Sequence, residues 1–284
     1  MWARHESRTR HKPFLQHVVT SETKWVSSDA GPVAHAYGLL ASTTHDTPPP
    51  CETRHNHNMW KRGLICRHVQ PGAAVADLMC NRGGDLLKYM HASVATYLGV
   101  DISPLCVAEA ARRASKCTTG MRTTFAVADL GIERIPCDGA IIDVAACMFG
   151  LHYLADDVAR MSSFLGEVAR ILKVGGTFVA IVPNHESVRE RLAAGDDGGG
   201  EKQYVLRGHP IPCDADLAER PWGHQYLFQF VGRTPLLPEY AVYPHALEDL
   251  AGQHGLQLRS ACPGPGRNSM YLELVFTRVH SGDL

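Results

Sequence analysis

The feature that most constrains the fold of this chain is its segment 77–88, which has the sequence DLMCNRGGDLLK. An apolar run at 73–78 leads into it, and Gly99-Val100-Asp101 follows it. This order predicts a strand, a nucleotide-binding loop, a helix, and then a second strand that ends in an acid. In such a unit the acid accepts both hydrogens of a ribose diol, and here that acid is Asp101.

Helix and strand patterns alternate along much of the remaining chain. We expect strands at 73–78, 97–100, 124–127, 140–146, 176–183, 257–260 and 271–277, and helices at 58–68, 104–116, 156–172 and 246–253. Such alternation is typical of an α/β fold with helices on both faces of a parallel sheet. We therefore predict a doubly wound, mostly parallel sheet of seven strands. Its ligand should lie beyond the carboxyl ends of the strands.

The chain divides into an N-terminal arm and one domain. Residues 1–50 lack sustained periodicity and contain three consecutive prolines, so we expect a poorly ordered arm. Residues 51–284 form the predicted domain. The run GDDGGG at 195–200 breaks the alternation, and 204–207 with 225–230 then suggests an inserted β-hairpin near 195–235. In the loop segment, Asp85 has the pattern of a helix N-cap.

Composition excludes several classes of function. The formal net charge is −1, so the chain as a whole is no partner for a long nucleic-acid duplex. The nine cysteines are odd in number and never spaced as Cys-x-x-Cys, which argues against disulfides and zinc, and we propose no metal. No run of about 18 apolar residues occurs. We expect a soluble protein of a reducing, intracellular compartment, with no membrane partner.

Several motifs occur in the order found in one family. They are RHNHNMWK at 54–61, DLMCNRGGDLLK at 77–88, Asp101-Ile102 with Arg113, MFGLHY at 148–153, GGTFVAIVPN at 175–184, PEY at 238–240 and SMYL at 269–272. In this series the chain resembles the mRNA cap guanine-N7 methyltransferases, from about Val33 to Arg278. The resemblance implies a Rossmann-like class I methyltransferase fold, S-adenosylmethionine as cofactor and the capped 5′ end of mRNA as substrate, with other capping-apparatus proteins as further partners.

The resemblance also implies roles for individual residues. Lys61 would meet the methionine carboxylate of the cofactor, Asp101 the ribose and Asp129 the adenine amine. The remaining cofactor positions would be Asp77, Met79, Met148 and Tyr153. The cap and its phosphates would be bound by His57, Asn58, Arg82, Lys88 and Arg113, and the guanine would be positioned by His152, Glu239 and Tyr271.

The chemistry agrees with this set of residues. Guanine N7 has a free lone pair, so its methylation needs no general base, nucleophile or metal. The protein has to align the two reactants, which contributes roughly 7–11 kcal/mol of the barrier. Because methylation places positive charge on the purine, a carboxylate such as Glu239 against the base would favour the reaction.

Each position also has a structural alternative. Asp77 and Asp101 could cap a loop or helix start, and Asp129 could form a turn. The cationic residues Lys61, Arg82, Lys88 and Arg113 could be solvated helix charges. His152, Tyr153, Glu239 and Tyr271 could be packing or loop residues.

The loop departs from the family pattern, which has glycines at the positions of Met79 and Asn81. Glycine permits positive φ and close backbone approach, so a methionine side chain there must point away from the cofactor. Two other functions therefore stay open. One is a non-catalytic cap-binding or regulatory subunit, and the other is a methyltransferase for another substrate. The expected compartment is the nucleus for a cellular protein and the cytoplasm for a viral one.

Overall fold

A seven-stranded sheet forms the centre of the computed structural model, which describes residues 2–6, 13–17, 23–25, 52–117, 120–195, 204–213, 220–231, 234–265 and 269–280. Its strand order is β12-β13-β8-β7-β4-β5-β6, and only β13 runs antiparallel to its neighbours. The strands are β4 (Ala74–Leu78), β5 (Thr96–Asp101), β6 (Arg122–Val127), β7 (Ile142–Met148), β8 (Leu172–Pro183), β12 (Leu256–Pro263) and β13 (Tyr271–Arg278). The predicted doubly wound, mostly parallel sheet of seven strands is confirmed.

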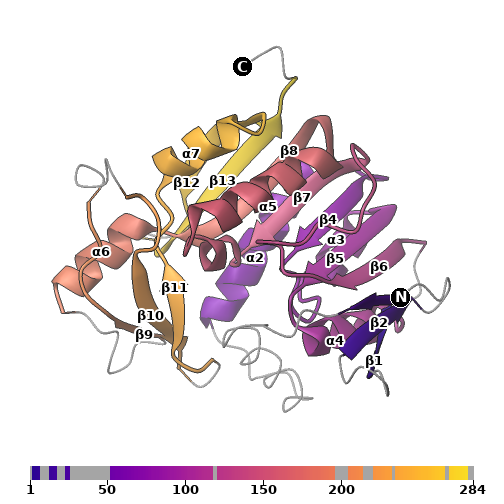
Figure 1. The fold of residues 1–284 in the computed structure, drawn as a ribbon, viewed down its shortest axis with the longest axis horizontal. Helices are drawn as coiled ribbons and strands as arrows, with labels where there is room; N and C mark the ends of the chain where they lie inside the picture. Colours follow the sequence, from indigo (N-terminus) through magenta and orange to yellow (C-terminus); the bar gives the residue numbers. More distant parts are fainter. Residues whose placement is uncertain are drawn as a thin grey trace.

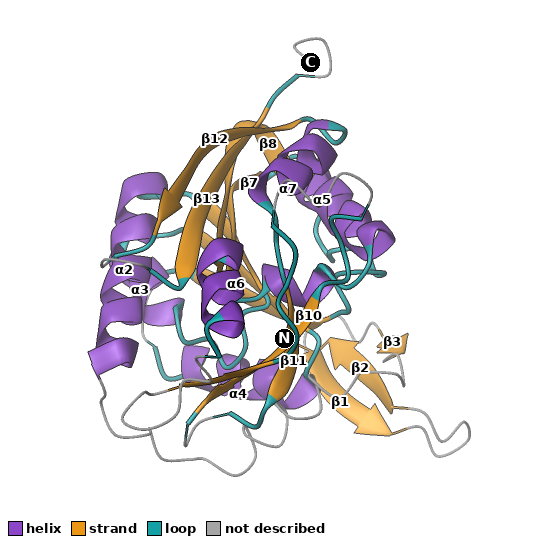
Figure 2. Cartoon of the chain, turned by 90° about the vertical axis from the view of Figure 1, so that its left-hand side faces the viewer, coloured by secondary structure: helices purple, strands orange, loops and turns teal. Residues whose placement is uncertain are grey.

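Helices cover both faces of this sheet (Figures 1 and 2). On one face, α2 (Glu52–His68), α3 (Leu86–His91) and α4 (Pro104–Ala114) pack against the sheet. On the other, α5 (Val158–Ile171) and α7 (Pro244–Gly252) bury their apolar sides. Successive residues of β4 show the division, because Val75 packs with the first group and Ala76 with the second.

The element boundaries differ from the predicted ones mostly by a few residues. The largest differences are at α2, which begins at Glu52 instead of Asn58, and at β8, which begins at Leu172 instead of Gly176. Helix α6 (His185–Ala193) was not predicted. This helix buries only His185, Ser187 and Val188, so it has no apolar stripe to reveal it.

The predicted insertion contains a second, small sheet. Strands β9 (Tyr204–Arg207) and β10 (Gln225–Phe230) pair antiparallel, as the hairpin prediction requires, and β11 (Leu237–Tyr240) adds a third strand on the other edge of β10. This sheet lies beside α6, at the left of Figure 1.

Three short antiparallel strands are described within the N-terminal arm: β1 (Trp2–Glu6), β2 (Pro13–His17) and β3 (Thr23–Trp25). The remainder of the predicted poorly ordered arm lies outside the described residues. Among the residues that are described, no helix is long and apolar enough to cross a bilayer.

Candidate active site

The loop after β4 has a backbone conformation that usually favours glycine. Met79 has φ +60° and Asn81 has φ +49°, followed by Gly83 at +67°. Positive φ is unfavourable for methionine, whereas asparagine tolerates it. Asn81 also accepts a hydrogen bond from the Arg82 amide through its Oδ1, at 2.7 Å. The loop therefore keeps a glycine-like path without glycine at these two places.

The side chain of Met79 lies against Gly150, the residue that precedes the short 3₁₀ helix η1 (Leu151–Leu154). A Cβ atom added to Gly150 would meet the Met79 sulfur at 2.6 Å and the Met79 Cβ at 2.9 Å. Met79 is half-buried and packs against the core on the α5 side of the sheet. The Met79 side chain thus packs into the space left by the missing side chain of Gly150, and this contact joins the loop to the start of η1.

Asp101 connects this loop to the helix that follows β5. Its carboxylate accepts the Asn81 amide at 2.8 Å and the Ser103 amide at 2.9 Å. Burial raises the pKa of Asp101 to about 6, against the lowering effect of these two hydrogen bonds. Ser103 is the N-cap of α4 and accepts from the Cys106 amide. Asp101 is therefore a buried acid at the carboxyl edge of the sheet, where the ribose acid was predicted.

Lys61, Asn58 and Lys88, which come from two helices, meet around a single acid. Asp85 accepts from Lys61 Nζ at 2.8 Å and from Lys88 Nζ at 2.6 Å, and Lys88 also donates to Asn58 Oδ1 at 3.0 Å. Asp85 stands at the N-cap position of α3 but accepts no capping hydrogen bond from that helix. The predicted N-cap position is confirmed, but the carboxylate makes no capping hydrogen bond, and the two lysines engage it instead.

Asp77 is buried behind the loop and accepts the Tyr97 hydroxyl at 2.7 Å. Burial, together with the nearby Asp85, raises the pKa of Asp77 to about 7. Asp129 accepts the Gly131 amide at 3.0 Å and pairs with Arg160 at 3.4 Å. Asp129 thus forms a turn, which was the structural alternative to a role in cofactor binding. Its carboxylate also faces the guanidinium of Arg160, a residue that was not predicted to belong to the site.

Arg113 lies away from these groups. It pairs with Glu109 at 2.8 Å on the exposed side of α4, roughly 13 Å past the first residue of the helix at 1.5 Å per residue. Arg82 remains in the loop itself, and Met148 ends β7 with its side chain against the α2 side of the core. The predicted phosphate-binding cations are therefore not gathered into one cluster.

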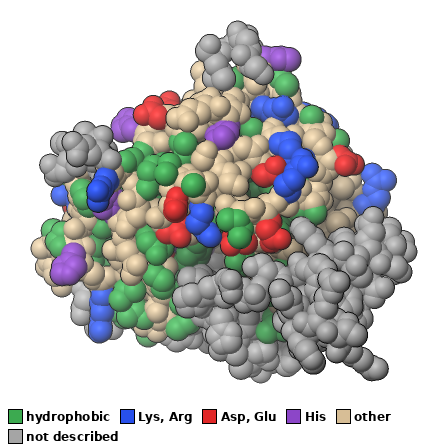
Figure 3. All heavy atoms as spheres, in the orientation of Figure 1, with side chains coloured by type: hydrophobic (Ala, Val, Ile, Leu, Met, Phe, Trp, Pro, Cys, Tyr) green, Lys and Arg blue, Asp and Glu red, His purple; other side chains and the backbone are tan. Residues whose placement is uncertain are grey.

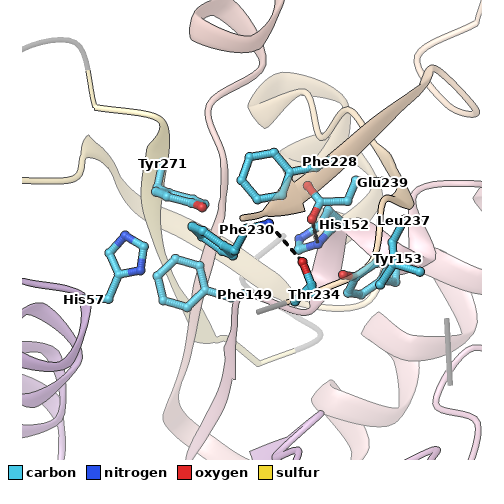
Figure 4. Close-up of a pocket in the computed structure, with 10 residues that line it drawn as sticks. All are labelled: His57, Phe149, His152, Tyr153, Phe228, Phe230, Thr234, Leu237, Glu239 and Tyr271. Carbon is cyan, nitrogen blue, oxygen red and sulfur yellow. Dashed lines mark hydrogen bonds and ion pairs between the residues drawn. The ribbon is translucent and has the colours of Figure 1, made fainter. Parts of the chain in front are cut away.

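A cavity of about 170 Å³ lies beside the loop, lined by His57, Phe149, His152, Tyr153, Phe228, Phe230, Thr234, Leu237, Glu239 and Tyr271. Figure 4 shows the rings between His57 at one end and Glu239 with Tyr153 at the other. Phe149 and Tyr271 meet edge to face with centroids 4.9 Å apart, and His57 lies 4.9 Å from Phe149. An apolar cavity of about 150 Å³ holds a benzene ring, so this one has room for a planar ring.

The polar end of the cavity is formed by His152 and Glu239. His152 is 3% exposed, and its Nε2 lies 3.5 Å from Glu239 Oε1. Neither ring nitrogen of His152 has a hydrogen-bond partner. Glu239 is 8% exposed and accepts the buried Tyr226 hydroxyl at 2.9 Å through its other oxygen. Buried polar atoms without partners are rare in folded proteins, so they point to a polar ligand at this place.

Five predicted residues therefore line one cavity: His57, His152, Tyr153, Glu239 and Tyr271. Reasoning from the sequence missed Phe228, Phe230 and the supporting Tyr226. A signal for them exists, because Tyr226, Phe228 and Phe230 alternate along β10 and so project from one face of the strand. Phe149 stood inside a motif but was given no role.

Comparison with known proteins decides the family. Residues 40–264 match the model of the mRNA (guanine-N(7))-methyltransferase domain. The chain belongs to this family. It is 28% identical over 246 residues to mRNA cap guanine-N(7) methyltransferase 1 of rice, which covers 81% of this chain and 66% of the relative. It is 27% identical to the mRNA cap guanine-N(7) methyltransferase of Saccharomyces cerevisiae over 76% of this chain and 53% of that one.

The chain thus spans between about half and two thirds of the length of these curated relatives. Among solved structures, a S-adenosylmethionine-dependent methyltransferase from Clostridium acetobutylicum matches it with a TM-score of 0.55 and 13% identity, over 87% of this chain and 98% of that one. At that identity the likeness shows the fold alone. In the described part of the chain, no group of three or more His, Cys, Asp or Glu residues could hold a metal ion.

Proposed function

We propose that this family member transfers a methyl group from S-adenosylmethionine to N7 of the guanine in the 5′ cap of mRNA. The observation that carries the proposal is the buried His152 beside Glu239, with neither ring nitrogen hydrogen-bonded, in an aromatic cavity. A guanine base offers N–H groups and carbonyl oxygens along its edge, which can pair with the imidazole nitrogens and with the remaining acceptor positions of the carboxylate.

The residues at the loop fit the proposed cofactor. Asp101 already accepts two backbone amides, but a carboxylate has about four acceptor positions, so it can also accept ribose hydroxyls. Asp129 would meet the adenine amine, and Lys61 the methionine carboxylate. Asp77, Met79, Met148 and Tyr153 would complete the site. When bound, S-adenosylmethionine supplies an electrophilic methyl group on a sulfonium.

The chain's own task is to align and stabilise the base. The N7 lone pair forms the new bond to the methyl carbon while the bond from carbon to sulfur breaks, so the positive charge passes to the purine and no proton moves. Tyr271, Phe149 and Phe230 can hold the ring plane, and Glu239 faces the charge that develops on it. His57, Asn58, Arg82, Lys88 and Arg113 are the proposed contacts for the cap and its triphosphate bridge.

The charge distribution on the surface agrees with a nucleic-acid substrate that is bound through a few local contacts. Across the middle of the face in Figure 3, Lys and Arg side chains lie next to Asp and Glu side chains, so the described residues present no broad basic area there. The proposed partner is accordingly the capped 5′ end and not a long duplex. Other proteins of the capping apparatus are proposed as further partners. The named relatives come from eukaryotes, and we propose the nucleus as the compartment.

The experiment that tests this proposal is transfer of labelled methyl from S-adenosylmethionine to GpppG-capped and uncapped RNA, with digestion to locate the label. Label confined to N7 of the cap guanine is expected. The glycine replacements Met79 and Asn81 favour one second candidate, a cap-binding subunit without catalytic activity. Titration of the protein with GpppG and with S-adenosylmethionine separates the two, since cap binding without cofactor binding would reject the enzyme.

A further inference from the structure

We infer that the cavity binds the methylated cap more tightly than the unmethylated one, so that this protein retains its product and is inhibited by it. The inference rests on the proposed function. It concerns the charge of the ligand that the cavity selects, which the family assignment leaves open.

The cavity has the composition of a site for a flat cation. Of the described residues that line it, Glu239 is the only carboxylate, and none is a lysine or arginine. Seven of the others carry aromatic rings: His57, Phe149, His152, Tyr153, Phe228, Phe230 and Tyr271. The faces of Phe and Tyr rings attract cations, and desolvation strengthens that attraction.

The negative charge of Glu239 is fixed in place. The Tyr226 hydroxyl donates to Oε2 at 2.9 Å, and Tyr226 is itself only 1% exposed. Tyr226 and Glu239 are directly opposite each other on β10 and β11, so the strand pairing holds the carboxylate. A neutral hydroxyl does not cancel the charge. The other oxygen, Oε1, faces the cavity-lining His152, whose Nε2 lies 3.5 Å away without a hydrogen bond between them.

Lys61 is the described lysine that lies against an aromatic ring of the cavity, with its Nζ 5.9 Å from the Phe149 ring. Asp85 accepts its hydrogen bond at 2.8 Å and, although it also pairs with Lys88, offsets part of its charge. An unmethylated guanine entering the cavity is neutral, whereas a 7-methylguanine is a delocalised cation. The aromatic faces and Glu239 therefore add attraction for the product that the substrate lacks.

Glu239 and the aromatic rings favour the positive charge that develops on the purine during methyl transfer. They also attract the same charge on the methylated product. Release of the product then becomes a slow step, and free methylated cap competes with substrate for the cavity. A difference of about tenfold in dissociation constant is expected, since cation–π attraction at a desolvated site together with one carboxylate supplies about 1.4 kcal/mol.

The test is calorimetric titration of the full chain with three dinucleotides: GpppG, its N7-methylated form, and an analogue with 7-methyl-7-deazaguanosine. The last carries the methyl group without the charge. We expect the dissociation constant of the N7-methylated cap to be about tenfold lower than that of GpppG, and that of the deaza analogue to be close to that of GpppG. The variant Glu239→Gln should narrow the difference between the N7-methylated cap and the other two ligands, while Asp138→Asn, on an exposed loop, should leave the differences unchanged.

Three results would overturn the inference. Equal binding of GpppG and its N7-methylated form, with labelled methyl still transferred, would reject product retention and leave the proposed function intact. Equal tightening by the methylated cap and the deaza analogue would show that the methyl contact, not the charge, is selected. Absence of binding by all three ligands to folded protein would remove the guanine assignment of the cavity and with it both proposals.

Discussion

The sulfur of Met79 occupies the place that a side chain on Gly150 would need, at 2.6 Å from the position of its Cβ. Gly150 has φ −132°, a value open to any residue, so space and not backbone conformation requires glycine there. A larger residue at 150 would displace the cofactor loop through Met79. The two positions are therefore coupled, although 71 residues separate Met79 from Gly150 along the chain.

We expect Gly150→Ala to lower the free energy of unfolding by about 1–3 kcal/mol, as overpacking does. In a Met79→Gly background the same substitution should cost little, because the sulfur is gone. Urea unfolding of the four proteins measures this coupling. Gly84→Ala is the matched control, since a Cβ at Gly84 meets nothing within 4 Å. Additive effects of the two substitutions would contradict the coupling.

Asp101→Ala should weaken binding of S-adenosylmethionine by about 1–3 kcal/mol, through lost hydrogen bonds to a charged acceptor. Isothermal titration gives the affinity. Ser103→Ala is the control, because it removes the N-cap of α4 and affects stability without touching the proposed ribose acceptor. An unchanged dissociation constant in Asp101→Ala would reject the assignment of this residue.

Asp85→Ala should destabilise the fold by about 3–5 kcal/mol, since it leaves Lys61 and Lys88 without their shared acid in a largely buried place. Burial acts to raise the pKa of Asp85, but the two lysines together hold that pKa below its usual value. Glu109→Ala is the matched control, because Glu109 also serves two cations, Arg112 and Arg113, on the surface. Its cost should stay below about 1 kcal/mol, and equal costs would refute this account.

Tyr226→Phe should weaken cap binding by about 1–2 kcal/mol and leave the affinity for S-adenosylmethionine unchanged. The reason is that Glu239 loses the donor to its Oε2 while buried. Tyr240→Phe is the control, as Tyr240 neighbours Glu239 on β11 and projects from the opposite face of the strand. Equal losses in both variants would mean that the hydroxyl does not position the carboxylate.

The free energy of unfolding should fall between about pH 4 and 7, in part because of Asp77. Burial raises the pKa of Asp77 to about 7 from an ordinary 3.8, so the folded protein binds more protons than the unfolded chain across this window. Stability from this group is therefore present at low pH and lost as pH rises. Asp77→Asn should flatten the decline measured by urea unfolding at pH 5 and pH 8, and Asp138→Asn should not. An unaltered slope in Asp77→Asn would exclude Asp77 as its source.

The sequence predicted the sheet and the helices that cover it because strands buried on both faces have continuous apolar runs, and loop and cap residues divide them. It predicted less well where tertiary contacts decide. Asp85 illustrates this, since its N-cap pattern is genuine but two lysines from different helices engage it. Arg113 illustrates it too, because helix geometry and Glu109 hold it away from the site.

Only some of the residues that line the cavity could be predicted from the sequence. Motif order named His57, His152, Glu239 and Tyr271, which the fold brings together from four separate elements or loops. Phe228 and Phe230 were not predicted because they lie in the insertion, where the strand pattern is short and none of the named family motifs occurs. Their alternation along β10 is visible in the sequence, but only the pairing of β10 with β11 shows that they lie on the same face as Glu239.

That pairing also limits how the protein can vary. Side chains alternate along β11, so a shift of one residue against β10 would replace Glu239 in the cavity with a neighbour and turn the acid to the opposite face. In the connection between the two strands, Thr234 contacts the end of β10: its Oγ1 accepts the Phe230 amide at 2.9 Å and its carbonyl oxygen accepts from Gln229 Nε2 at 2.8 Å. Insertion or deletion of a single residue there would leave the large sheet intact while exchanging the base-recognition chemistry. The number of residues in this short connection, more than their identity, should therefore determine whether Glu239 stays in the cavity and whether the protein keeps its substrate.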